Sequence, residues 1–396
     1  MANVWYDHWI ATQPVRDSAI VRDLRRLHLA EWGVEPNEGQ LRHYLYRLAF
    51  EDETWHGRED VARIIERQAV PEPPAPDLPG VRVAGQLFEQ VDGTPWTMIQ
   101  CSDFHLLGRW IRGEDIQPIL QQRRDGGFNT LRVWTAYDLE DAGIGRLIPS
   151  EHSDYDTRLV EFLSLCAQWG LYIELTAFTG RMHSAYTTIF QNDDAMLAHW
   201  ARLQSVAPPE TTLLELVNEG DHEANFQIPW DSLGRPAHIA SHGSARADLW
   251  PPRVPPFASP WGFSSYHTND LPEWWRKVGH NAMEIADHYG IPVSANENQR
   301  FPDKDANPTH AYDAARAAAL LCAGSCYHSV HGKSSQLWTG LEETAAQAWA
   351  AGARSVPLEF QRGAYRHRTD LEQGNFLRVY QRTLPDGREY VVEVRR

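Results

Sequence analysis

Between residues 96 and 330 the sequence alternates short apolar runs with longer segments of helical periodicity. A short apolar run bounded by turn residues is typical of a buried strand, whereas apolar residues that recur at the helical period are typical of an amphipathic helix. Regular alternation of the two favours a parallel sheet covered by helices, and eight repeats favour closure into a barrel. The predicted strands span residues 96–102, 130–136, 171–178, 212–219, 236–241, 261–267, 291–297 and 323–330.

Helical segments separate most of these strands. Only residues 220–235, between the fourth and fifth strands, hold no convincing helix. No glycine-rich nucleotide-binding fingerprint follows a predicted strand, which weakens the alternative of an open, dinucleotide-binding sheet. The chain is therefore predicted to be an α/β protein, a (β/α)8 TIM barrel. The clearest predicted helices span residues 114–125, 156–169, 192–204, 272–289 and 310–321.

At 396 residues the chain is longer than one typical domain, so smaller parts are expected to flank the barrel. Residues 1–70 are predicted to form a small N-terminal helical segment, because leucine and isoleucine recur there at helical spacing. Residues 71–80 are rich in proline and are predicted to be a stiff linker. The barrel is expected over residues 81–345, and a C-terminal extension with a β-hairpin over residues 346–396.

Turn residues predict a hairpin on either side of the barrel strands. The turn sequence Asp92-Gly93 follows two short apolar runs within residues 81–88, and this hairpin is expected to cover the bottom of the barrel. Residues 376–394 hold two further strand-like runs around a turn at residues 385–387. They are predicted to form a terminal hairpin.

Composition excludes several classes of partner. The net charge is -16 and no run of five basic residues occurs, so neither nucleic acid nor an anionic membrane is an expected partner. The chain opens with no basic segment followed by an apolar core, and no stretch approaches 18 uninterrupted apolar residues. The protein is therefore expected to lack a signal peptide and to be cytoplasmic or released by a non-classical route. The 16 tryptophans suit sugar binding as well as core packing.

The four cysteines are Cys101, Cys166, Cys322 and Cys326. Their spacing is that of neither a zinc site nor a redox motif. Buried free thiols in a reducing compartment are the favoured interpretation, and a disulfide stays open.

Two predicted strands end on a glutamate. Residues 211–219 run through apolar positions to Asn218-Glu219, and residues 291–297 run to Glu297. In a parallel barrel the C-terminal strand ends converge on the face where active sites lie. A facing pair of carboxylates there suits acid and nucleophile chemistry on a glycosidic bond. On its own, an Asn-Glu pair after an apolar run is more typical of a helix cap or a solvated turn, and only together with Glu297 and Arg132 does it favour a catalytic site.

At these residues the chain resembles the retaining glycoside hydrolases of the (β/α)8 clan A, and within it family 5 with its cellulases and mannanases. The resemblance covers about residues 81–338. The segment Leu216-Val217-Asn218-Glu219 is similar to the strand-4 signature of the clan. This similarity implies that Glu219 is the acid/base and that Asn218 binds the sugar 2-hydroxyl.

Two further segments carry the resemblance. Residues 292–297 are similar to the strand-7 end of the clan, which implies that Glu297 is the nucleophile. Residues 127–134 resemble the strand-2 segment, which implies that Arg132 keeps Glu297 ionised, since an adjacent guanidinium lowers a carboxyl pKa. The implied reaction is double displacement at a β-glycosidic bond of an oligo- or polysaccharide, with carboxyl groups about 5 Å apart. It needs no cofactor and no metal.

Five other residues are candidate substrate contacts. Tyr266 and His267 close the sixth predicted strand, where clan members often carry a His or a Tyr near the nucleophile, and His328 lies on the eighth. Trp134 and Trp338 are the aromatic side chains expected beside the sugar, with core packing as the alternative.

The chain departs from the family 5 pattern at three places. The His that follows strand 3 in that family is missing from residues 173–180, and Asn269 stands where an aromatic residue is expected. Trp338 lies several residues later than the strand-8 Trp of the family. The sequence therefore supports the clan better than the family.

Two other functions stay open. A metal-dependent hydrolase would use His267, His328, His331 and Asp303, although His328 and His331 are three apart at a strand end, where alternating side chains point to opposite faces. A catalytically inactive barrel would instead bind carbohydrate or serve as a structural component, with residues 1–70 as its docking segment. The same segment could mediate self-association or attachment to a larger assembly such as a virion.

Overall fold

The chain divides into two compact units, Met1–Pro74 and Ala75–Arg396. The predicted N-terminal helical segment and most of the proline-rich linker lie outside the residues that the structure describes. The computed structural model describes residues 78–139, 145–179, 189–218, 228–229, 232–245, 261–267, 274–356, 364–367, 376–383 and 389–395, together with Arg25, His28, Leu29, Pro36 and Leu41.

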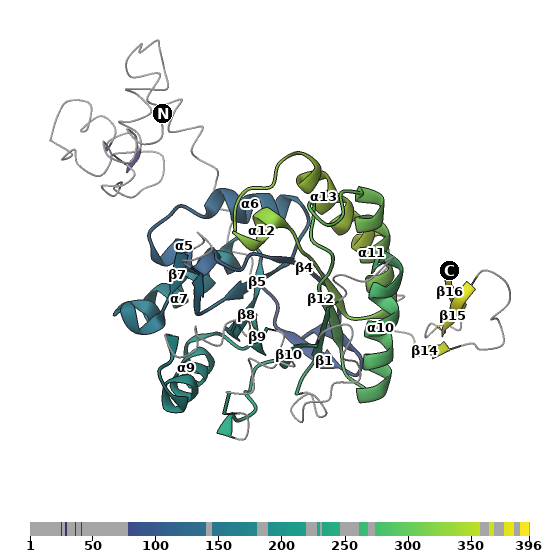
Figure 1. Cartoon of the computed structure of the whole chain (residues 1–396), viewed down its shortest axis with the longest axis horizontal. Helices are drawn as coiled ribbons and strands as arrows, with labels where there is room; N and C mark the ends of the chain where they lie inside the picture. The colour runs from purple at the N-terminus through teal and green to yellow at the C-terminus, as the bar shows by residue number, and fades with distance from the viewer. Residues whose placement is uncertain are drawn as a thin grey trace, which may run out of the picture. The chain divides into compact units, whose positions relative to one another are not determined.

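Eight strands of the second unit close into a barrel in the order β10-β11-β12-β13-β4-β5-β8-β9 (Figure 1). Every neighbouring pair is parallel. The predicted (β/α)8 fold is thus confirmed, and each of the eight predicted strands has its counterpart. The barrel strands are β4 (Met98–Ser102), β5 (Thr130–Trp134), β8 (Tyr172–Phe178), β9 (Thr212–Val217), β10 (Ala240–Ala245), β11 (Ser264–His267), β12 (Val293–Glu297) and β13 (Gly324–Tyr327).

Strand β10 lies later in the chain than predicted. It begins at Ala240, whereas the sequence predicts a strand over residues 236–241. Pro236 has no N–H to donate and cannot occupy an internal position of a hydrogen-bonded ladder. Further along β10, Gly243 has a φ of 128°, and a Cβ there would lie 1.8 Å from the carbonyl oxygen of Val217. The close approach of β9 and β10 therefore requires glycine at this position.

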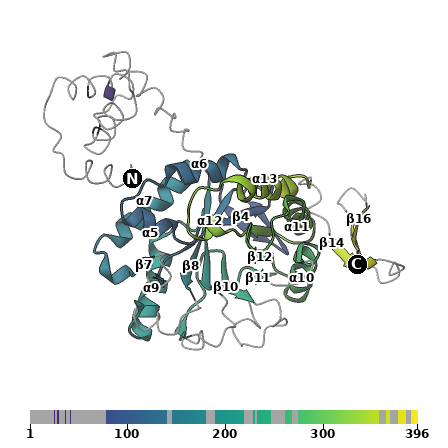
Figure 2. The same cartoon turned by 45° about the horizontal axis from the view of Figure 1, so that its top comes forward.

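Helices cover the outside of the strands (Figures 1 and 2). The five predicted helices are confirmed as α6, α7, α9, α10 and α11, while α5, α12 and α13 are not predicted from the sequence. The helices are α5 (Leu106–Ile111), α6 (Gln117–Asp125), α7 (Tyr155–Gln168), α9 (Asp193–Val206), α10 (Trp274–Tyr289), α11 (Pro308–Leu321), α12 (Val330–Lys333) and α13 (Gly340–Arg354), with a 3-10 turn at Pro149–Glu151.

Helix α13 runs across the boundary predicted at residue 345, so the helical layer of the barrel continues to Arg354. It packs against α11, and both helices bury faces made largely of alanine. Gly352 of α13 lies so close to α11 that a Cβ would be 2.2 Å from the carbonyl oxygen of Tyr312. Small side chains give a weak apolar periodicity, which is why this helix is not predicted from the sequence.

A small antiparallel sheet closes the bottom of the barrel, as predicted. It consists of β1 (Val81–Ala84), β2 (Leu87–Gln90) and β3 (Pro95–Trp96). Phe88 and Trp96 from this sheet form an apolar cluster with Met98, Tyr172 and Leu213, which lie at or near the N-terminal ends of barrel strands. The ring centroids of Trp96 and Tyr172 are 4.9 Å apart, edge to face. Apolar packing is thus concentrated beneath the barrel and between the strands and helices.

Two further sheets lie outside the barrel. Strands β6 (Tyr137–Leu139) and β7 (Gly145–Leu147) form a two-stranded sheet between β5 and α7 in the chain. Near the C-terminus, β14 (Ala364–His367), β15 (Phe376–Thr383) and β16 (Glu389–Arg395) form an antiparallel sheet. The pairing of β15 with β16 confirms the predicted terminal hairpin.

All four cysteines are buried and free, in agreement with the favoured interpretation. The helices of the described part of the chain include none that is both long enough and apolar enough to cross a membrane.

Candidate active site

Arg132 connects three strands at the C-terminal end of the barrel. Its Nη1 donates to Glu297 Oε1 on β12 at 2.6 Å, its Nε donates to Glu215 Oε2 on β9 at 2.8 Å, and its Nη2 donates to Asn218 Oδ1 at 2.7 Å. The Arg132 side chain is fully buried. Three of the predicted site residues, Arg132, Asn218 and Glu297, are therefore brought together although they lie far apart in the sequence.

Strand geometry explains why these side chains meet. Successive side chains on a strand point to opposite faces, so Thr130, Arg132 and Trp134 share one face of β5. Leu131 and Val133 point the other way, into the apolar layer beneath the helices. Because β4, β5, β8 and β9 are neighbours in the barrel, a long side chain from β5 reaches the acidic side chain of β9 across the interior.

Glu297 is held as a carboxylate. It is 7 % exposed, and this burial alone would raise its pKa. In the acidic range where Glu297 titrates, protonated His267, Arg132 and protonated His328 act in the opposite direction and bring the pKa of Glu297 down to about 2. His267 Nδ1 lies 3.9 Å from Glu297 Oε2. The side chain is thus ionised at neutral pH and is available as a nucleophile.

His328 lies close to Glu297 but stays neutral. Burial lowers the pKa of His328 to about 4, against the opposing effect of the Glu297 charge. Its Nδ1 is 3.0 Å from Ser102 Oγ at the end of β4. His267 and His328 therefore flank the predicted nucleophile from β11 and from the chain after β13.

Glu219 lies outside the described residues, as do residues 220–227, 246–260 and 268–273. The predicted separation of about 5 Å between the carboxyl groups of Glu219 and Glu297 therefore stays a prediction. Asn218, the residue before Glu219, is 4 % exposed. It lies directly after β9 and bonds to Arg132.

Trp134 and Tyr266 are both buried. Phe104 stacks on the Trp134 ring with centroids 4.2 Å apart and planes 6° apart, and His105 meets the ring edge-on at 5.7 Å. One face of Trp134 is therefore covered by protein. Tyr266 belongs to the apolar cluster of the barrel and its helices, whereas the next residue, His267, follows a register shift and lies beside Glu297.

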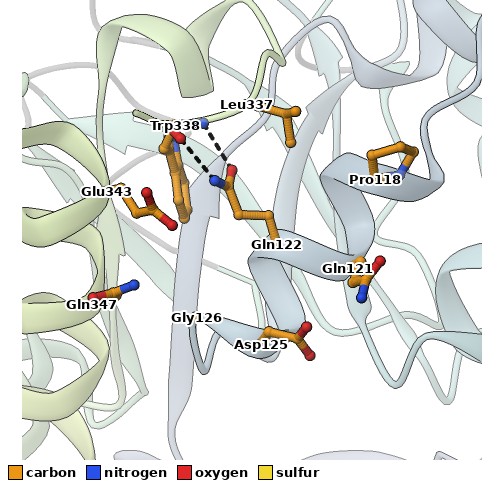
Figure 3. A pocket seen from close by; sticks show the side chains of 9 residues that line it. All are labelled: Pro118, Gln121, Gln122, Asp125, Gly126, Leu337, Trp338, Glu343 and Gln347. Atoms are coloured by element: carbon orange, nitrogen blue, oxygen red, sulfur yellow. Dashed lines mark hydrogen bonds between the residues drawn. The ribbon is translucent and has the colours of Figure 1, made fainter. Parts of the chain in front are cut away.

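Trp338 lies between α6 and α13, outside the strand barrel. Its ring centroid is 5.3 Å from those of Phe128 and Tyr327, and the Arg123 guanidinium covers it at 3.5 Å. Gln122 holds both the backbone N–H and the carbonyl of Trp338 (Figure 3). This placement favours the alternative of core packing for Trp338.

A cleft of about 340 Å³ opens beside Trp338, lined by both helices (Figure 3). Its lining is mostly amide and carboxylate side chains of α6 and α13, and Glu297 is not among them. The lining residues are Pro118, Gln121, Gln122, Asp125, Gly126, Leu337, Trp338, Glu343 and Gln347.

The four residues of the predicted alternative metal site do not come together, because they have different partners. His331 bonds to Glu342 through its backbone N–H and its Nδ1, and Asp303 pairs with Arg300. His267 and His328 lie beside Glu297. Within the described residues no three His, Cys, Asp or Glu side chains are grouped so that they could hold a metal ion.

Several buried polar residues of the barrel interior are not predicted from the sequence. Glu215 accepts hydrogen bonds from Arg132, from Thr176 Oγ1 at 2.6 Å and from Asn296 Nδ2 at 3.2 Å. Glu174 on β8 accepts a hydrogen bond from Gln100 on β4. Both glutamates are fully buried. A single carboxylate in the middle of an otherwise apolar strand is the signal that could have identified each of them.

Solved structures with the same fold include a Bacteroides vulgatus protein named as a glycoside hydrolase, which is 13% identical, with a TM-score of 0.51 over 78% of this chain and 67% of its own. The endo-β-1,4-mannanase of Thermotoga petrophila is 12% identical, with a TM-score of 0.50 over 77% of this chain and 90% of its own. No protein-family profile and no curated protein sequence matches the chain. At such identities the likeness is one of fold, and for the fold the predicted resemblance to (β/α)8 glycoside hydrolases is confirmed.

Proposed function

We propose that the chain is a retaining glycoside hydrolase that cleaves a β-glycosidic bond, with Glu297 as the nucleophile and Glu219 as the acid/base. The observation that carries the proposal is the buried pair of Glu297 and Arg132 at the C-terminal end of the barrel. A buried carboxylate is costly unless it is paired, and active sites of this fold lie at that end.

Asn218 supports the place of Glu219 in this proposal. Asn218 bonds to the same guanidinium as Glu297. Glu219 is the next residue, so the Cα atoms of Asn218 and Glu219 are about 3.8 Å apart. Asn218 and Glu297 thus share one guanidinium, and the proposed acid/base follows Asn218 directly in the sequence. This proximity is compatible with a carboxyl separation of about 5 Å, the spacing for retention of configuration.

The proposed reaction proceeds in two steps. Glu297 attacks the anomeric carbon while neutral Glu219 protonates the departing oxygen, and this yields a covalent glycosyl-enzyme. Glu219 then removes a proton from water, which attacks the same carbon and releases the sugar with Glu297 as the leaving group. His267 and His328, which flank Glu297, are proposed to contact the sugar bound there, and Asn218 its 2-hydroxyl. The substrate is an oligo- or polysaccharide.

A panel of aryl glycosides and polysaccharides tests this proposal. Glu219→Ala and Glu297→Ala should each lower turnover by several orders of magnitude, whereas Glu161→Ala, on the exposed face of α7, should not. Azide should restore the Glu297→Ala variant and give a glycosyl azide of inverted configuration. Near wild-type turnover in both active-site variants would overturn the assignment. Oligosaccharide binding without any turnover would favour the inactive carbohydrate-binding barrel.

A further inference from the structure

Glu174 and Gln100 form a buried acid-amide pair beneath the proposed active site. Gln100 Nε2 donates to Glu174 Oε2, and both side chains are fully buried. The other two oxygens, Gln100 Oε1 and Glu174 Oε1, are buried with no hydrogen-bond partner within the described residues. Two acceptor oxygens cannot bond to each other. A proton on Glu174 would turn its free oxygen into a donor, and the amide oxygen of Gln100 would accept from it.

The balance of charges in the barrel interior also favours a proton on Glu174. Three carboxyl groups, those of Glu174, Glu215 and Glu297, act on one guanidinium, that of Arg132. The guanidinium of Arg132 donates hydrogen bonds to Glu215, Glu297 and Asn218. Among the residues that the structure describes, Glu174 thus receives a hydrogen bond only from the amide N–H of Gln100. A buried carboxylate without a cation is strongly disfavoured, so the third carboxyl group is the one expected to stay neutral.

The groups that face Glu174 come from four strands. They are Gln100 on β4, Arg132 on β5, Glu215 on β9 and Cys326 on β13. Burial and then the negative charge of Glu215 raise the pKa of Glu174 to about 8, against smaller opposing effects of Arg132 and Gln100. Burial also raises the pKa of the Cys326 thiol, which is therefore uncharged.

We propose that Glu174 is a neutral carboxylic acid doubly hydrogen-bonded to Gln100, and that this leaves the guanidinium of Arg132 to Glu215, Glu297 and Asn218. Glu215 is then a charged positioning residue, and Glu174 is its uncharged neighbour. Glu215 anchors the guanidinium from below, and neutral Glu174 does not compete for it. The link to Glu297 as nucleophile rests on the proposed function, whereas the protonation of Glu174 does not.

Infrared difference spectroscopy of the full chain tests the protonation without any substrate. The carbonyl stretch of a protonated carboxylic acid is separate from carboxylate bands. At pH 7 the wild type should show such a band, which should shift on 13C labelling of glutamate carboxyls, be absent from Glu174→Gln, and fade as the pH rises above about 8. Gln is the matched replacement, because two amides can form the same pair of hydrogen bonds. A wild-type protein without this band at pH 7 would overturn the proposal, whether or not the variant folds.

Turnover tests the positioning role. With an aryl glycoside whose leaving group needs no protonation, Glu215→Gln should lower kcat at least 100-fold and change KM little. Deprotonation of Glu174 should lower the kcat of the wild type above about pH 8, whereas Glu174→Gln should keep kcat within about threefold of the wild type at pH 6 and should not show this fall. A loss of kcat in Glu174→Gln equal to that in Glu215→Gln would refute the difference in charge state. If the infrared band is present but no glycoside is cleaved, the neutral acid stands and the proposed function fails.

Discussion

Replacement of Glu174 by Gln should stabilise the protein at neutral and alkaline pH. Glu174 is fully buried, and its pKa of about 8 lies well above the value of 4.5 for an exposed glutamate. The unfolded chain therefore releases a proton that the folded chain keeps. Gln cannot ionise and can keep the hydrogen bonds of the neutral acid, so it removes this cost.

The size of the effect follows from the two pKa values. Each pH unit between 4.5 and about 8 costs the wild type about 1.4 kcal/mol relative to the variant. The difference should be near zero at pH 4.5, roughly 2 kcal/mol at pH 6 and roughly 5 kcal/mol above pH 8, where it becomes constant. The sign is that of a raised folded-state pKa. The stability that protonated Glu174 contributes to the wild type is fully present below pH 4.5, the pKa in the unfolded chain. It is lost as the pH rises to about 8, the pKa in the folded chain.

Urea unfolding of wild type and Glu174→Gln from pH 5 to pH 9 measures this difference. Titrating groups that do not interact with Glu174 behave alike in both chains, so their effects cancel when the two free energies of unfolding are subtracted. Glu161→Gln is the matched control, because Glu161 is exposed on α7 and should give a difference that does not depend on pH. If the difference is flat between pH 5 and pH 8, Glu174 is ionised in the folded state and the reasoning fails. If Glu174→Gln is less stable than the wild type throughout, the predicted stabilisation is wrong.

Three other predictions concern separate parts of the barrel. Arg132→Lys should lower kcat/KM about 100-fold or more and move the acidic limb of the pH profile upward, because one compact ammonium cannot reach the three acceptors spaced around the planar guanidinium and no longer holds the pKa of Glu297 near 2; a pH series with the aryl glycoside measures both. Trp96→Ala should lower the free energy of unfolding by about 3–5 kcal/mol without a shift in the pH profile, as urea unfolding and turnover would show. Gly243→Ala should give little soluble protein or a strongly lowered melting temperature in a thermal scan, because its Cβ would overlap the Val217 carbonyl.

The fold could be predicted from the sequence because its signal is local. Apolar runs and helical periods identify eight strands and five helices without knowledge of their partners. The misses have local causes as well. Pro236 has no N–H for a ladder hydrogen bond, and β10 begins at Ala240, four residues later than predicted. Helix α13 buries small alanines, whose periodicity is too faint to separate it from a C-terminal extension.

The candidate site could be predicted only in part. Arg132, Asn218 and Glu297 follow from motifs at strand ends, and the structure joins them through one guanidinium. The pair of Glu174 with Gln100 could not be predicted, because it depends on the stagger of β4 and β8 on either side of β5. Trp338 illustrates the opposite error. This aromatic residue packs against Gln122 and Arg123 of α6 and lies away from the proposed sugar-binding residues around Glu297.

In this barrel the apolar cluster at the bottom and the charged residues of the interior have different roles, the first in stability and the second in the proposed chemistry. TIM barrel interiors are dominated by branched apolar side chains, but here Gln100, Arg132, Glu174 and Glu215 occupy the strands above the bottom cluster. Buried ion pairs contribute little net stability, so the apolar contacts around Trp96 and under the helices must supply it. The interior charges are then free to fix the ionisation of Glu297. Substitutions in the bottom cluster should therefore change the free energy of unfolding with little effect on the pH dependence of turnover. Substitutions among the interior charges should instead mainly change the pH dependence of turnover.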